Sequence, residues 1–391
     1  MRKALLVLTI ILLVAMLSVV SCKSDPVEPE EDGAIHASTF AEFTKGLTSA
    51  KKTESKTLIL DADIVWDSTK YPGGADVTGD EEYRLNSGKT VSIRVARLNE
   101  GALTIDVTGL TIDLGGHTIS NIPSRAFNLT GNSFTIKNGT LSAAAGSDRY
   151  TLCINYANTN IKTESDKSVT DGLKDVALDH VPASYTDSDA VWAKRIVVDG
   201  IKTQGIIAAY STVEIKNSSS TNEQYRGFNL IGSSGIVENC SSSSTVSENA
   251  ALFVSNYGSV LIKGTNMFAG RIGLYVYHCA TVTVDTNATF VVGDHGATIG
   301  DKNNYAYAVE RQSELVIKGT IKFNTIAPKA IATFNNGSRL VIAAGATVLD
   351  KTDAIVNKGG DGVSTKADSK GSYDSAWAGY NVAPVVTDNR E

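Results

Sequence analysis

The segment Glu214-Ile215-Lys216-Asn217 decides the fold, because variants of it return at regular intervals along the second half of the chain. The last inward apolar residues of the short strands in this region are Ile215, Val237, Ile262, Val284, Ile317 and Ile342. Subtraction gives steps of 22, 25, 22, 33 and 25 residues. A recurring period of this size is typical of a solenoid, in which each repeat stacks on the one before it. The sequence therefore predicts an all-β solenoid.

Two further columns support this register. A residue that tolerates positive φ follows the strand in many coils: Asn138, Gly200, Asn217, Asn239, Gly264 and Gly319. The outward residue before this turn alternates in charge: Lys216, Glu238, Lys263, Asp285 and Lys318. Coils stack about 4.8 Å apart, so opposite charges become neighbours. We expect a surface ladder of charges here, not a functional site.

The composition excludes several classes of protein. The 391 residues include 34 Gly and only 7 Pro, and hydrophobic residues make up 42%, which indicates a folded chain with many tight turns. The net charge is −6 and no basic stripe is visible, so we expect no nucleic-acid partner. Cys153, Cys240 and Cys279 lack metal-type spacing, so buried thiols are expected and no metal site is assigned.

The start of the domain carries a resemblance. Thr39 and Glu42 form a capping-box pattern for an amphipathic helix, and Leu58-Ile59-Leu60-Asp61 follows as a strand. Leu110-Thr111-Ile112-Asp113-Leu114-Gly115-Gly116-His117-Thr118-Ile119-Ser120 is similar to the first-coil segment of pectin-lyase-like right-handed parallel β-helix proteins. The resemblance covers about residues 37–358. It implies a right-handed parallel β-helix of about ten or eleven coils, with the helix as its N-terminal cap, but that fold serves many functions.

The N-terminus predicts export. Arg2 and Lys3 precede an apolar run, and the run ends at Val19-Val20-Ser21-Cys22, which resembles a bacterial lipobox with Cys22 as the lipidated residue. The expected organisation is a signal peptide at 1–21, a lipidated acidic tether at 22–37, an N-terminal cap at 38–90, the β-helix at 91–358 with an irregular loop insertion at 148–193, and a C-terminal tail or cap at 359–391.

The candidate site lies one strand earlier in each coil, on the outer face of the strands that precede those ending in Val237, Ile262, Val284, Ile317 and Ile342. Alignment of these strands, which places Ile331 opposite Tyr307, turns aromatic, cationic and amide side chains outward. Aromatic rings stack on sugars, and Arg and Asn bind hydroxyls or carboxylates. The predicted ligand-binding residues are Arg226, Asn229, Phe253, Asn256, Arg271, Tyr275, Tyr277, His278, Glu310 and Arg311. The alternative is ordinary cross-coil packing of Phe253 on Tyr275.

Three functions stay open at this point. The first is a non-catalytic glycan- or surface-binding protein of the bacterial cell envelope, lipid-anchored at the outer membrane or cell surface and monomeric. The second is a polysaccharide lyase, in which Arg271, His278 and Arg311 are the candidate catalytic residues and Glu310 helps to hold Ca²⁺. The third is a purely structural or antigenic surface protein. Hydrolysis is disfavoured because it usually needs two carboxylates, and Glu310 is the single carboxylate among the outward residues of the aligned strands. No other cofactor is expected.

Overall fold

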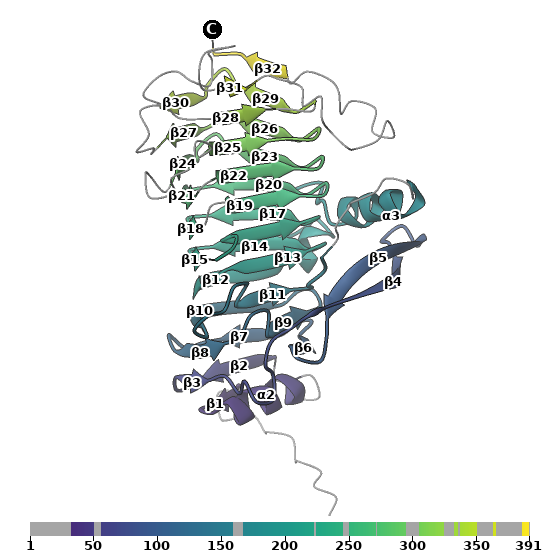
Figure 1. The fold of residues 1–391 in the computed structure, drawn as a ribbon, viewed down its shortest axis with the longest axis vertical. Helices are drawn as coiled ribbons and strands as arrows, with labels where there is room; N and C mark the ends of the chain where they lie inside the picture. The colour runs from purple at the N-terminus through teal and green to yellow at the C-terminus, as the bar shows by residue number, and fades with distance from the viewer. Residues whose placement is uncertain are drawn as a thin grey trace, which may run out of the picture.

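The protein is an elongated column of stacked strands, a parallel β-helix (Figure 1). This computed structural model describes residues 33–50, 56–158, 167–222, 224–244, 250–270, 272–294, 305–323, 332–334, 337–349, 363–364 and 385–390. The predicted signal peptide, Cys22 and most of the tether and tail lie outside the described residues.

Three strand-bearing faces surround one core, and from β2 to β31 each chain turn contributes to each face. The first face consists of β1 (Ile35–Ala37), β2 (Thr57–Leu60), β7 (Thr111–Asp113), β10 (Thr135–Ala143), β12 (Ile196–Thr203), β14 (Thr212–Lys216), β17 (Ser234–Glu238), β20 (Ser259–Lys263), β23 (Thr281–Val284), β26 (Glu314–Ile317), β29 (Arg339–Ile342) and β32 (Val385–Asp388). The long strands β10 and β12 continue into the second face.

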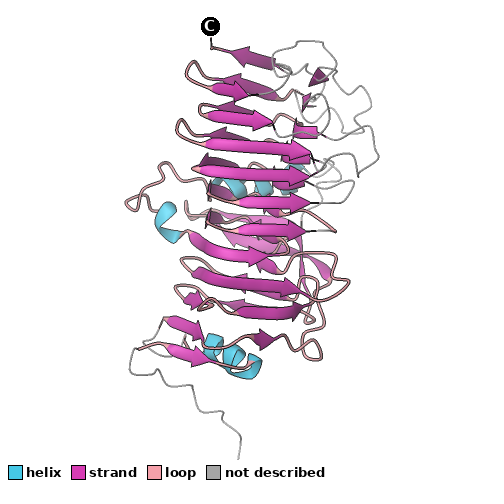
Figure 2. Cartoon of the chain, turned by 90° about the vertical axis from the view of Figure 1, so that its left-hand side faces the viewer, coloured by secondary structure: helices cyan, strands magenta, loops and turns pink. Residues whose placement is uncertain are grey.

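The second face adds β3 (Ile64–Val65), β8 (Thr118–Ile122), β15 (Ser219–Asn222), β18 (Ser241–Ser244), β21 (Thr265–Gly270), β24 (Thr289–Asp294), β27 (Thr320–Phe323) and β30 (Thr347–Leu349). The third face is a separate sheet of β6 (Leu103–Asp106), β9 (Phe127–Thr130), β11 (Leu152–Ile154), β13 (Ile206–Ala209), β16 (Phe228–Ile231), β19 (Ala250–Ser255), β22 (Ile272–Tyr277), β25 (Tyr305–Val309), β28 (Ala332–Phe334) and β31 (Val363–Ser364). Figure 2 shows the parallel strands stacked along the column axis.

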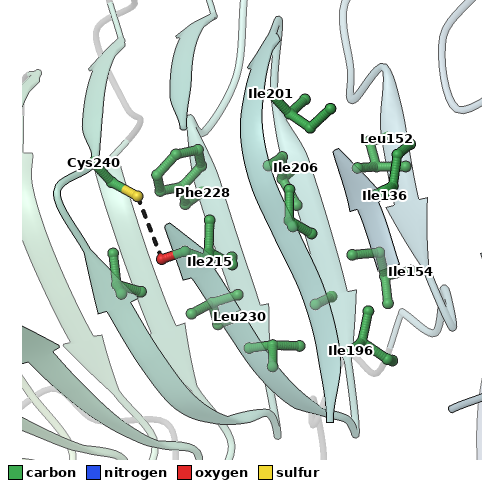
Figure 3. Close-up of a cluster of buried hydrophobic side chains, with 14 of the residues drawn as sticks. Ile136, Leu152, Ile154, Ile196, Ile201, Ile206, Ile215, Phe228, Leu230 and Cys240 are labelled. Atoms are coloured by element: carbon green, nitrogen blue, oxygen red, sulfur yellow. Dashed lines mark hydrogen bonds between the residues drawn. The ribbon is translucent and has the colours of Figure 1, made fainter. Parts of the chain in front are cut away.

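The predicted register of the first face is confirmed. Ile215 pairs with Val237, Val237 with Ile262, Ile262 with Val284, Val284 with Ile317 and Ile317 with Ile342. All these side chains are fully buried and belong to one continuous core. Figure 3 shows part of that core, where aliphatic side chains from opposite faces interdigitate and the thiol of Cys240 donates to the carbonyl oxygen of Ile215 at 3.4 Å.

The turn column is confirmed with one exception. Asn138, Asn217 and Asn239 have φ of 58°, 50° and 53°, and Gly264 has φ of 64°. The amides of Asn138 and Asn217 donate to Asp113 and Asp199 of the adjacent coil, at 3.2 and 2.9 Å. The side-chain oxygen of Asn239 accepts from the backbone of Thr265 at 3.0 Å. Gly319 does not have positive φ; glycine is needed there because a Cβ would lie 2.1 Å from the carbonyl oxygen of Asp285.

The N-terminal end of the core is covered by helix α2 (Phe40–Ser49). Thr39 accepts a hydrogen bond from the backbone of Glu42, and Glu42 accepts from the backbone of Thr39, which confirms the capping box. The buried Phe43 packs on Phe127 with ring centroids 6.0 Å apart. The cap boundary at residue 90 is wrong, however, because β2 within 38–90 already pairs with β7 of the first face. The apolar residues Leu58 and Leu60 of β2 are therefore part of the column core and do not merely cover its end.

A lateral module projects from the column beside the third face (Figure 1). It consists of the antiparallel hairpin β4 (Asp76–Arg84) and β5 (Thr90–Leu98) and the helix α3 (Lys167–Leu178). The start of the solenoid at residue 91 is therefore also wrong, since β5 pairs with β4 and with no strand of the column; its one bridge outside the hairpin joins Ala96 to Asn158. The insertion at 148–193 is not wholly irregular, because it forms α3 and a short 3₁₀ helix at Trp192–Lys194.

The module has an apolar core of its own. Alternate residues of β5, among them Ile93 and Val95, and Leu173 and Val176 of α3 pack onto Ile207 of the third face. Neither the hairpin nor the helix can bury enough surface alone, so each is ordered by the other and by the sheet. Part of the outer surface of the third face is thus covered.

Candidate functional site

The outer column of the third face runs in the predicted register. Asn229 pairs with Phe253, Phe253 with Tyr275 and Tyr275 with Ala308. The alternate residues of these strands lie in the core, as the period of two requires. The sequence alignment was wrong by one residue at the last pair of strands, β25 and β28, because Tyr307 pairs with Ala332 and not with Ile331.

Three aromatic rings gather on this face. Phe253 and Tyr275 are 5.2 Å apart between centroids with an interplanar angle of 89°, and Tyr277 lies 5.1 Å from Tyr275 and 6.0 Å from Phe253. These distances lie within the range in which aromatic pairs attract. The predicted cross-coil packing of Phe253 on Tyr275 is therefore present, and it forms one aromatic cluster with Tyr277.

Arginine side chains cover the rings. The guanidinium carbon of Arg226 lies 3.6 Å from the centroid of Phe253, and that of Arg311 lies 4.4 Å from the centroid of Tyr277. Arg149 lies 4.3 Å from the centroid of Tyr225. Such contacts hold a guanidinium group in place over the ring.

We call this set the arginine–aromatic stripe; it consists of Arg149, Tyr225, Arg226, Phe253, Tyr277 and Arg311. It extends from the loop before β11 to the turn after β25, and its three arginines are all partly exposed. The sequence alignment missed Arg149 and Tyr225, which lie in loops outside the aligned strands. Tyr225 directly precedes the predicted Arg226, and this was the one available signal.

Three of the predicted ligand-binding residues are not open to solvent. Asn256 and His278 are 6% and 5% exposed, and Asn229 is 2% exposed. The amide of Asn229 donates to the phenol oxygen of Tyr150, which covers it. These three residues were predicted to contact ligand, and burial by neighbouring loops and turns contradicts that role.

His278 is held by its neighbours. Its ring stacks on Tyr277 at 4.2 Å with an interplanar angle of 16°, and its Nε2 lies 2.6 Å from Nη1 of Arg311. Burial and then the Arg311 charge lower the pKa of His278 to about 3. The imidazole is therefore neutral at pH 7, accepts from Arg311, and positions that guanidinium.

Tyr275 and Glu310 form a second fixed pair. The Tyr275 hydroxyl donates to Oε2 of Glu310 at 2.7 Å. Burial, and then the Glu310 carboxylate, raise the pKa of Tyr275 well above its ordinary value. The phenol thus stays protonated and is unsuited to remove a proton from a sugar at neutral pH.

Arg271, a predicted ligand-binding and catalytic residue, lies outside the described residues. The side chains of β28 are not described either. Within the described part of the chain, no three His, Cys, Asp or Glu side chains converge so that they could hold a metal ion. No helix in that part is long and apolar enough to cross a membrane.

No family model matches this chain, and neither a curated protein nor a solved structure matches it significantly.

Proposed function

We propose that this chain is a lipid-anchored, monomeric protein of the bacterial cell envelope, at the outer membrane or cell surface, with a pectin-lyase-like β-helix. Its stripe binds acidic polysaccharide without cleaving it. The observation that supports this most strongly is the placement of Arg226 and Arg311 on Phe253 and Tyr277, on one face of the column. The anchor rests on the lipobox pattern that ends at Cys22.

An acidic glycan fits the stripe better than a neutral one. The faces of Phe253 and Tyr277 carry guanidinium groups, so a sugar would meet cations before it met bare rings. Guanidinium groups bind carboxylates and sulfates through paired N–H donors. Arg226 is not in a described ion pair, whereas Arg149 has Asp148 at 3.7 Å.

The geometry favours binding over cleavage. Glu310 is occupied by Tyr275, and His278 is too buried to reach a substrate proton. Hydrolysis of a glycosidic bond usually needs two carboxylates flanking that bond. Elimination needs a base beside the uronate, and neither His278 nor Tyr275 meets that need in its present surroundings.

A glycan array tests the proposal. The full chain with Arg226→Gln and Arg311→Gln should retain polygalacturonate, alginate and chondroitin sulfate at least about tenfold less than the wild type. Arg94→Gln is the matched control, because Arg94 is an exposed cation of the hairpin away from the stripe. Wild-type retention should fall with salt, and dextran should not be retained. Thermal melts confirm that both variants fold.

Two results would overturn the proposal. If the double variant binds like the wild type, the stripe is not the site. If the wild type releases unsaturated uronates from these polymers, the protein is a lyase. The anchor is tested separately, since Cys22→Ser should lose labelling by radioactive palmitate, and persistent labelling would refute it.

A further inference from the structure

A cleft separates the lateral module from the third face of the column. It comprises a cavity of about 500 Å³ and an adjoining one of about 230 Å³. Both are lined by Arg84 at the end of β4, Asn132, Asp179 and His180 after α3, and Tyr210 after β13. The combined space lies in the size range of small-molecule sites.

The walls of the cleft are fixed by hydrogen bonds. Arg97 of β5 pairs with Glu81 at 2.7 Å and donates to the carbonyl oxygens of Asn155 and Tyr156 at 3.1 and 2.7 Å, which ties the hairpin to the third face. On the other side, the backbone of Asn86 donates to the Asp179 carboxylate at 3.0 Å. A site with walls held in this way loses little entropy when it takes a ligand.

Several polar groups of the cleft are not used by the fold. Among the described residues, the side chains of Arg84 and Asn132 and the ring of His180 form no hydrogen bond or ion pair. Burial lowers the pKa of His180 to about 4, so at pH 7 its ring offers one donor and one acceptor. Tyr83 and Tyr210 add aromatic surface to the same space.

The local charges favour a single anion. Arg97 is paired with Glu81, and Lys89 with Asp175 at 2.7 Å. Asp179 is occupied by Asn86, although its charge remains at one wall. Lys194 lines only the smaller cavity, where its ammonium donates to Oδ1 of Asn86 at 3.4 Å. Arg84 lines both cavities, and no described carboxylate neutralises it. One carboxylate on the ligand would be matched there, while a second would meet Asp179.

We propose that this cleft binds one small polyhydroxylated acid, of the uronic acid class. Its carboxylate pairs with Arg84, its hydroxyls bond to Asn132 and His180, and its ring packs against Tyr83 or Tyr210. This site goes beyond the polymer-binding stripe and does not depend on it, because the two share no residue.

Isothermal titration of the full chain with D-galacturonate, D-galactose and inorganic phosphate tests the inference. Galacturonate should bind at least about tenfold more tightly than galactose, because only the acid pairs with Arg84. Phosphate should bind more weakly than galacturonate, because it cannot use the aromatic wall. Equal affinity for galactose, or for phosphate, would overturn the proposal.

Variants locate the site. Arg84→Gln should weaken galacturonate binding about tenfold or more and leave galactose binding unchanged, whereas Asn132→Ala should weaken both. Arg94→Gln, on the same hairpin, should change neither. The double variant of Arg226 and Arg311 should keep full galacturonate affinity. If that double variant loses it while Arg84→Gln does not, the sugar binds at the stripe; the cleft inference then fails while the proposed function stands.

Discussion

Burial determines the chemistry of His278. The ring is 5% exposed and lies against Arg311, and both effects disfavour the imidazolium. The same surroundings make it a positioning residue for Arg311, because a neutral Nε2 can accept a hydrogen bond from the guanidinium. His278 was expected from the sequence to contact ligand; in the structure it is buried and holds the Arg311 guanidinium.

Stability should depend on the protonation of His278. Its folded pKa of about 3 lies below the ordinary value of 6.5, so the unfolded state binds more protons between those values. The free energy of unfolding should therefore be retained above pH 6.5 and fall as the pH drops toward 3, by up to about 1.4 kcal/mol per pH unit. Urea unfolding at pH 4.5, 6 and 8 measures this slope.

His278→Gln should flatten that slope without abolishing it, since burial also lowers the pKa of His180. An unchanged slope in the variant would show that His278 does not carry the effect.

Within a single strand, the close stacking of the coils can leave no room for a side chain. Gly235 is the second residue of the largely buried strand β17 and has φ of 149°. A Cβ there would lie 1.8 Å from the carbonyl oxygen of Val213 in the adjacent coil. Backbone atoms cannot move away without breaking the ladder between β14 and β17. The glycine is therefore required by stacking.

Gly235→Ala should lower the free energy of unfolding by about 2–4 kcal/mol, because the clash is with backbone. Gly345→Ala is the control, since no atom lies within 4 Å of a Cβ at that position and its φ is not positive. Chemical denaturation compares the two. Equal stabilities would mean that the stack can expand locally.

The hairpin depends on Arg97 for its attachment. Replacing this side chain removes its pairing with Glu81 and its bonds to two carbonyl oxygens of the third face. In Arg97→Gln, we expect backbone amides of β4 and β5 to exchange hydrogen at least about tenfold faster, while those of β14 and β17 stay protected. Hydrogen-exchange mass spectrometry measures both regions. Uniform exchange across the protein would contradict a local attachment.

At the scale of the molecule, the column and the lateral module form separate apolar cores. Cys240 lies in the core of the column, and Cys153 lies between the third face and the module. Burial raises the pKa of Cys240 to about 12 and that of Cys153 further still. Both thiols should be inert toward a thiol reagent in the native state.

Labelling under increasing urea should modify Cys153 before Cys240. The smaller module core rests on fewer contacts, whereas the column core is continuous over the stacked coils. Mass spectrometry of each labelled peptide gives the order. Simultaneous labelling would show that the module and the column unfold as one unit.

The solenoid and its register follow from the amino-acid sequence alone. Its side chains repeat with the coil, so Ile215, Val237 and Ile262 could be placed above one another from spacing alone. The amphipathic helix and its capping box were equally local signals. Each of these features depends on residues that are neighbours in sequence or one period apart.

The segments that cover the third face could be identified only from the three-dimensional packing. The hairpin and α3 are far apart in sequence and meet on β13, so no local pattern predicted that they form the lateral module and its cleft. The burial of Asn229 by Tyr150 likewise joins residues 79 positions apart. The alternation along a strand predicts whether a side chain points inward or outward. Whether an outward side chain is exposed to solvent depends on how the inserted segments pack, and that packing does not repeat with the coil.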